Sequence, residues 1–187
     1  MNSYLANPLA FLIDVTVGLF ILAVMLRFLL QWVHADFYNP VSQLIVRVTN
    51  PLLKPLRRII PGFGGVDWAS IILLLLLTSL KLLLLFALQG RLPPWPGLAP
   101  LVLAELISSF LNIFMFTILI QVIISWVAPH QHNPAAMLLQ QLNEPLLRPL
   151  RRLLPPMGGL DLSPLLVLVL IQLSKILLLP PLYILAA

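Results

Sequence analysis

The sequence PLLKPLRRIIPGFGGVD over residues 51–67 returns 94 positions later as PLLRPLRRLLPPMGGLD over residues 145–161. With the same offset, 22 of the 59 aligned positions from 27 to 85 are identical. The matches include proline, glycine, tryptophan and polar positions, which a leucine-rich composition does not explain. The chain is therefore predicted to be a tandem duplication, with residues 1–92 as the first repeat and residues 93–187 as the second.

The composition indicates a chain that is solvated mainly by lipid. Its 187 residues are 60% hydrophobic and 9% charged, with a mean hydropathy of +1.04, whereas soluble domains carry about 25% charged residues. The absence of cysteine excludes disulfides, thiolate catalysis and cysteine-based zinc sites. No Lys or Arg precedes the first apolar run, so we expect that run to stay as a membrane helix.

Four apolar stretches are long enough to cross a bilayer, whose hydrocarbon core requires roughly 20 residues of helix. They cover approximately residues 9–33, 68–88, 101–128 and 165–186. The expected fold is thus an all-α membrane protein with two tandem hairpins, each carrying an amphipathic helical loop. Because each repeat contains an even number of spans, both hairpins insert the same way up, unlike the inverted repeats of many transporters.

The orientation follows from the distribution of basic residues. The segments that join the paired spans contain seven of them: Arg47, Lys54, Arg57, Arg58, Arg148, Arg151 and Arg152. The opposite side carries only Arg91. Since cytoplasmic loops collect Lys and Arg, we expect the basic loops in the cytoplasm and both termini on the periplasmic side.

Each basic loop contains helix-start and helix-stop signals. Asn39-Pro40 and Asn133-Pro134 are typical of an N-cap followed by proline at the first helical position. A second short helix is expected after Asn50, kinked at Pro55. The glycine pairs at Gly64, Gly65, Gly158 and Gly159 are expected to turn the chain back toward the membrane, ahead of Asp67 and Asp161.

The second helical segment of each loop is amphipathic. Lys54, Arg57 and Arg58 share one face, and the second repeat matches them with Arg148, Arg151 and Arg152. We expect the apolar face to lie in lipid and the cations to face anionic headgroups of the inner leaflet, each worth roughly 1 kcal/mol. A docking face for a protein partner is the alternative. The apolar counterface argues against direct nucleic acid binding.

Several charges lie within the predicted spans. Lys81 and Lys175 occupy equivalent positions, with Asp14 and Glu105 at similar depths in the neighbouring spans. The sequence predicts one acid–lysine pair per hairpin. These charges form either structural clamps, the interpretation we favour, or an ion or proton path.

A further pair is expected at the basic-loop end of the first hairpin. Arg27 and Asp67 lie at similar depths there. Gln121 replaces Arg27 in the second repeat, so this pair is not expected twice.

Catalytic and metal-binding motifs are absent from the sequence. There is no phosphate-binding glycine loop, nucleophile elbow or HExxH helix. His130 and His132, with His34 in the equivalent loop, are better explained as solvated residues than as metal ligands. The sequence therefore predicts neither an enzyme nor a cofactor.

The tandem NPLLKPLRRIIPGFGGVD and NEPLLRPLRRLLPPMGGLD segments, each between two spans, resemble the YggT family, and the resemblance covers almost the whole chain. It implies a bacterial inner-membrane protein without enzymatic activity, related to single-hairpin YlmG-type proteins. It also implies associations with osmotic-shock tolerance and potassium uptake, with cell division, and with plastid cytochrome assembly.

Two functions compete on this basis. The first is a membrane scaffold or assembly factor that docks a protein partner or a second copy through its basic loops. The second is a pore or transporter subunit in ion or osmotic homeostasis.

Overall fold

The computed structural model describes residues 3–91, 95–127, 133–153 and 161–186. The described residues contain six helices: α1 Ser3–Trp32, α2 Pro40–Ile59, α3 Trp68–Leu88, α4 Trp95–Val127, α5 Pro134–Leu153 and α6 Ser163–Ala186. Within these ranges the only extended pairing is an isolated bridge between Phe63 and Val66. Each loop helix, α2 or α5, has 20 residues and connects two apolar helices of 21 to 33 residues.

Four helices are long and apolar enough to cross a membrane. They cover Asn7–Trp32, Trp68–Leu88, Trp95–Val127 and Ser163–Ala186, with mean hydropathies of 2.6, 2.8, 2.2 and 2.2. The predicted all-helical fold with four long apolar helices is confirmed, and these four helices fit a multi-pass membrane protein. The third helix begins six residues earlier than expected, and residue 128, its predicted end, lies outside the described residues.

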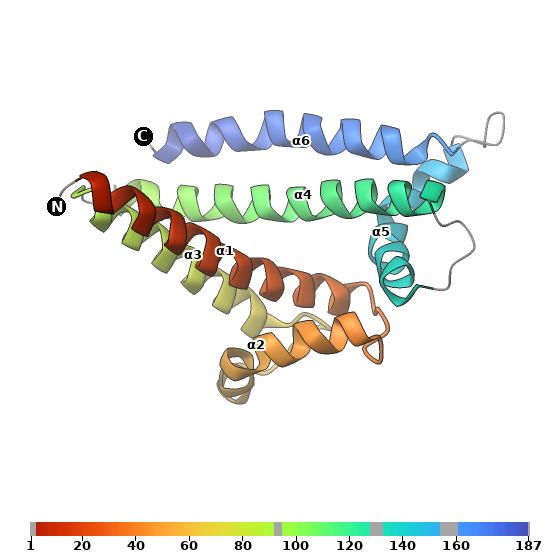
Figure 1. Cartoon of the computed structure of the whole chain (residues 1–187), viewed down its shortest axis with the longest axis horizontal. Helices are drawn as coiled ribbons and strands as arrows, with labels where there is room; N and C mark the ends of the chain where they lie inside the picture. The colour runs from red at the N-terminus through yellow and green to blue at the C-terminus, as the bar shows by residue number, and fades with distance from the viewer. Residues whose placement is uncertain (1–2, 92–94, 128–132, 154–160, 187) are drawn as a thin grey trace.

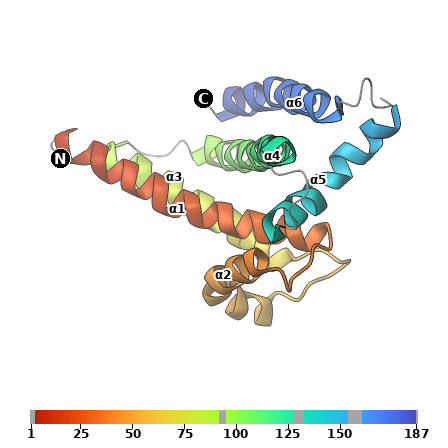
Figure 2. The ribbon, with the colours of Figure 1, turned by 45° about the vertical axis from the view of Figure 1, so that its right-hand side comes forward.

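The long helices pack in two pairs, α1 with α3 and α4 with α6, and α4 lies between its partner α6 and the α1–α3 pair (Figures 1 and 2). Both termini lie at one end of the molecule, and α2 and α5 lie at the other, which we call the loop end (Figure 1). The core continues from the long helices into the loop helices. Its fully buried side chains include Val24, Leu29, Leu53, Ile118 and Leu147.

The loop helices differ from the prediction in two respects. Each is one helix of 20 residues rather than two short ones, and the ribbon changes direction along its length (Figure 2). Pro51 and Pro55 in α2 lack the amide hydrogen of a regular helix, which explains the bend.

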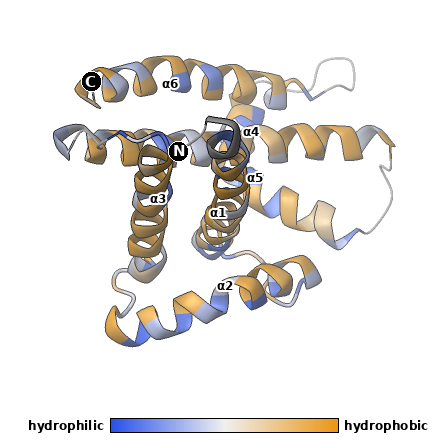
Figure 3. Cartoon of the chain, turned by 60° about the vertical axis from the view of Figure 1, so that its left-hand side comes forward, coloured by the Kyte–Doolittle hydropathy of each residue, from blue (hydrophilic) through white to orange (hydrophobic). Residues whose placement is uncertain are grey.

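The second difference concerns what the apolar side of each loop helix contacts. We expected this side to lie in lipid, but Leu53 and Leu147 pack against the long helices, with at most 1% of their surface exposed. Only part of the apolar side, such as Ile59, remains exposed. Figure 3 shows the alternation of hydrophobic and hydrophilic residues along α2, in contrast to the hydrophobic α1 and α3. These helices are therefore integral to the core.

A tight turn returns the chain from α2 to α3. Gly64 and Gly65 have φ values of 67° and 77°, and the Val66 amide donates a hydrogen bond to the Phe63 carbonyl at 3.2 Å. Two successive positive φ angles define a type I′ turn, which side chains with a Cβ rarely adopt. The turn places Asp67 at the start of α3. Its counterparts in the second half, Gly158 and Gly159, lie outside the described residues.

Candidate functional site at the loop end

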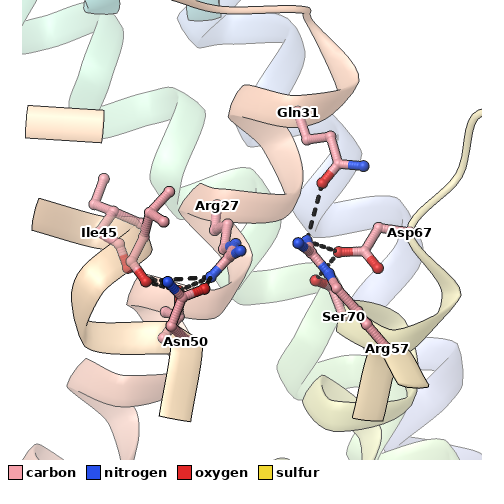
Figure 4. A network of polar contacts seen from close by, with 9 residues as sticks. Arg27, Gln31, Ile45, Asn50, Arg57, Asp67 and Ser70 are labelled. Carbon is pink, nitrogen blue, oxygen red and sulfur yellow. Dashed lines mark hydrogen bonds and ion pairs between the residues drawn. The ribbon is translucent and has the colours of Figure 1, made fainter. Parts of the chain in front are cut away.

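An arginine of the loop helix and the aspartate that precedes the next long helix form an ion pair. In the first half, Arg57 Nη2 lies 2.5 Å from Asp67 Oδ2. Asp67 Oδ2 also accepts a hydrogen bond from the Ser70 hydroxyl at 2.5 Å, and Gln31 Oε1 of α1 accepts one from Arg57 at 3.1 Å (Figure 4). The contact thus connects α1, α2 and α3.

The same pair recurs ten residues apart in the second half, with different surroundings. Arg151 Nε donates to Asp161 Oδ2 at 2.9 Å, and Arg151 Nη1 donates to Glu144 Oε2 at 3.1 Å. Asp161 also accepts a hydrogen bond from the Ser163 amide. The side chain of Asp67 is 5% exposed, whereas that of Asp161 is 41% exposed. The second pair is therefore the weaker and more hydrated one.

Both aspartates are held in their charged form. Burial alone would raise the pKa of Asp67, but hydrogen bonds from Arg57 and Ser70 outweigh it and lower the pKa below its ordinary value of 3.8. Burial would also raise the pKa of Asp161, but hydrogen bonds from Ser163 and Arg151 outweigh it and lower the pKa overall. Each carboxylate is thus a fixed anchor for its arginine near neutral pH.

Arg27 does not pair with Asp67, so that prediction was wrong. The Arg27 Nη1 atom donates instead to Thr49 Oγ1 at 2.7 Å and to Asn50 Oδ1 at 2.9 Å (Figure 4). It also reaches the Val46 carbonyl oxygen at 3.3 Å. Arg27 is 5% exposed and contacts α2 immediately before Pro51, where the helix bends. Arg57, being closer, takes the carboxylate.

The second half fills the equivalent place with neutral groups. Asn143 Nδ2 donates to Gln121 Oε1 at 2.8 Å, and the Thr117 hydroxyl donates to Asn143 Oδ1 at 2.8 Å. Asn143 is completely buried. Hydrogen bonds between neutral side chains therefore join α4 to α5, whereas the Arg27 guanidinium joins α1 to α2.

A second polar centre lies within the long helices. Lys81 Nζ contacts Asp14 Oδ1 at 3.1 Å and Glu105 Oε1 at 2.6 Å. The pair between Asp14 and Lys81 agrees with the prediction. The predicted pairing of Glu105 with Lys175 was wrong, because α4 packs against α3 and brings Glu105 to Lys81.

Lys175 has a neutral partner instead. Its Nζ donates to Asn112 Oδ1 at 2.8 Å. The two lysines at equivalent positions thus differ in kind: Lys81 joins both halves through two carboxylates, whereas Lys175 holds α6 to α4 through one amide.

A cleft of about 530 Å³ lies beside the Lys81 cluster, between α1 and α4. Its walls are mostly apolar, and their polar members are Asp14, Ser109, Asn112 and Thr117. The Asp14 side chain is 60% exposed. One ammonium against two carboxylates leaves the cluster with a formal charge of −1.

The loop helices of the two halves touch each other. Asn39 Oδ1 caps α2 by accepting from the Val41 amide at 2.9 Å, and Asn39 Nδ2 donates to the Pro134 carbonyl at 2.6 Å. Asn133 Oδ1 accepts from the Ala135 amide at the start of α5 in the same manner. The N-terminal ends of α2 and α5 therefore meet.

The remaining basic residues of the loops extend outward. Within the described residues, Lys54, Arg58, Arg148 and Arg152 form no ion pair. All four of these side chains are exposed. Of the six cations assigned to a docking face, four are available and two, Arg57 and Arg151, are occupied by aspartates.

No group of three or more His, Cys, Asp or Glu side chains that could hold a metal occurs in the described parts of the chain. His130 and His132 lie outside them. Sequence reasoning missed the arginine–aspartate pair, although its signal was visible: both repeats retain Arg and Asp ten residues apart.

The chain was also compared with known proteins. The CCB3/YggT family model matches residues 6–88 and 100–182. A Pseudomonas aeruginosa protein is 50% identical over 166 residues, covering 84% of this chain and 82% of its own length. YggT of Escherichia coli K12 is 40% identical over 165 residues, or 88% and 86% of the two chains.

A more distant similarity is to YlmG homolog protein 2, chloroplastic, of Arabidopsis thaliana. It is 37% identical over 76 residues, covering 39% of this chain and 29% of that protein. No solved structure matches the chain. None of the descriptions of these relatives names a catalytic activity.

Proposed function

Because the chain belongs to the CCB3/YggT family, we propose that it is a non-catalytic scaffold of the bacterial inner membrane. In this proposal the loop end faces the cytoplasm and both termini face the periplasm. The surface formed by α2 and α5 lies against the anionic inner leaflet and docks a protein partner, or a second copy of the chain.

One observation carries the proposal: the internal ion pairs use Arg57 and Arg151 and leave Lys54, Arg58, Arg148 and Arg152 without a partner among the described residues. Exposed apolar side chains flank these cations, with Ile59 and Phe63 both 81% exposed. Cations beside exposed apolar groups suit an interface with anionic headgroups or an acidic protein surface. The Arg57–Asp67 and Arg151–Asp161 ion pairs fix the position of the loop helices that carry these cations.

The test is a pull-down of the tagged chain from its native membrane in mild detergent, with partners identified by mass spectrometry. The loop variant K54E/R58E/R148E/R152E retains Arg57 and Arg151, so the fold is expected to survive. The matched control is R91E at the opposite end of the molecule. A stoichiometric partner that the loop variant loses and R91E retains is the expected result. A partner retained by both variants, or none at all, contradicts the proposal.

A second candidate function is supported by the Lys81 cluster. Its excess negative charge within the spans requires a compensating cation or proton, and the cleft beside Asp14 offers a route. This arrangement suits a subunit of an ion-conducting or osmotic system. The test replaces Lys81 and Lys175 by Met and measures growth after osmotic upshock. Normal tolerance at normal protein levels excludes this candidate.

A further inference from the structure

An apolar cleft opens at the loop end of the second half. It has a volume of about 580 Å³, within the range of small-molecule sites. Its walls come from α4, α5 and α6 and include Val122, Ser125, Leu165 and Leu168, and Trp126 and Arg151 also line it. Because α4 and α6 are membrane-crossing helices, the molecules that surround this cleft are lipids.

The first half has almost no such space at the equivalent place. There, a hollow of about 60 Å³ is lined by Phe28, Gln31 and Trp32. Phe28 stands where the second half has Val122, and Gln31 stands where it has Ser125. Gln31 reaches across to Arg57, whereas the Ser125 hydroxyl donates to the Val122 carbonyl of its own helix. The shorter side chains at these two positions contribute space to the cleft. Gly65 and Val66 also line the first-half hollow, and their counterparts lie outside the described residues.

The charged side chains that line the cleft are Arg151 and Asp161, which form an ion pair. Arg151 uses Nε and Nη1 for Asp161 and Glu144, and its Nη2 donates no hydrogen bond to the described residues. Arg148 and Arg152 do not line the cleft, but they lie within one turn of Arg151 on α5 and are exposed. The three arginines and the two carboxylates leave an excess of one positive charge. An apolar slot that ends at excess positive charge is complementary to an acyl chain that ends in a phosphate.

We propose that the cleft between α4, α5 and α6 is a binding site for one anionic phospholipid. The acyl chain lies along Val122, Leu165 and Leu168, and the headgroup phosphate binds beside Arg151. The site belongs to the second half alone. It goes beyond the docking function, because it requires no partner protein.

The test measures quenching of tryptophan fluorescence by a brominated lipid. One single-tryptophan protein retains Trp126 (W32F/W68F/W95F), and the matched control retains Trp32 (W68F/W95F/W126F). Both residues are largely exposed at the loop end, 75% and 56% respectively. The full-length proteins are reconstituted in phosphatidylcholine vesicles that contain a variable fraction of brominated phosphatidylglycerol. Trp126 is expected to be half-quenched at a roughly five-fold lower fraction than Trp32, the preference of one added cation–phosphate contact.

Filling the cleft provides the decisive variant. V122F/S125Q gives the second half the residues of the first and is expected to bring Trp126 quenching to the level of Trp32. The single change S125Q serves if the double variant does not fold. Equal quenching of the two tryptophans overturns the proposal, as does equal quenching of Trp126 by brominated phosphatidylcholine and phosphatidylglycerol. A filled variant that changes from dimer to monomer with unchanged quenching assigns the cleft to a second copy and also overturns it.

Discussion

The two halves of the molecule join their loop helices to their long helices with the same backbone plan and different polar chemistry. In the first half, Arg27 and the Arg57–Asp67 pair are charged and largely buried. In the second half, the Gln121–Asn143 network is neutral, and the Arg151–Asp161 pair is more than one third exposed. Both halves contain the arginine–aspartate pair, but the other polar contact between loop helix and long helix uses the charged Arg27 in the first half and neutral side chains in the second. At the loop end, the first half has only a small hollow, whereas the second half has an open cleft.

The largest expected difference concerns the two equivalent lysines. Lys81→Met leaves the Asp14 and Glu105 carboxylates together without a cation, and we expect it to cost about 3–5 kcal/mol of unfolding free energy. Lys175→Met removes only an amide contact to Asn112, for about 1 kcal/mol. Unfolding with sodium dodecyl sulfate in mixed micelles measures both. Restoration of stability in D14N/K81M/E105Q is the control, and equal losses for the two lysine variants contradict the asymmetry.

The arginine–aspartate pairs should differ next most. Asp67→Asn weakens a buried, charge-assisted contact and is expected to cost about 2 kcal/mol. The equivalent change Asp161→Asn should cost about 0.5 kcal/mol, because the second pair is hydrated. The same unfolding assay compares the two variants. A larger loss for Asp161→Asn shows that the exposed pair dominates.

Arg27→Gln tests whether an amide can replace the guanidinium group that joins α1 to α2. It gives the first half the residue that Gln121 provides in the second. We expect a loss of about 1 kcal/mol, because an amide can donate to Asn50 but lacks the charge that strengthens the bond. The readout is the midpoint of thermal unfolding in detergent. A loss as large as that of Lys81→Met means that Arg27 has no neutral substitute.

The smallest effect is the pH dependence of the first pair. The pKa of Asp67 is lowered on folding, so its contribution is complete above the ordinary value of 3.8 and is lost as pH falls through the lower folded value. The stability difference between wild type and Asp67→Asn should therefore shrink as the pH falls below 3.8. A difference that is constant from neutral pH to well below that value indicates that the Asp67 charge is not the cause.

The sequence predicted the long helices well, because twenty-residue apolar runs admit few alternatives. It predicted the Asn39 and Asn133 caps for a similar reason, since Asn-Pro carries a local structural signal. The partners of the charges could not be read in the same way. The choice of Asp67 between Arg27 and Arg57, and of Glu105 between Lys81 and Lys175, depends on helix rotation and on how α4 packs against α3.

The loop helices show a second limit of the sequence. Their apolar side was expected in lipid, since a one-dimensional pattern identifies an apolar face but not what covers it. Leu53 and Leu147 pack instead on the long helices. The cleft beside Trp126 was also beyond sequence reasoning, because it depends on how α4, α5 and α6 pack and on side-chain size at positions such as 122 and 125.

The position of Glu105 has a consequence for the order in which the protein is made. Glu105 lies 24 residues after Lys81 in the chain, which corresponds to about 1–5 s of translation at ordinary rates. Until Glu105 has been made, Asp14 is the only one of the two carboxylates that Lys81 can contact. The cluster is therefore complete only when the second half of the chain has begun to be made.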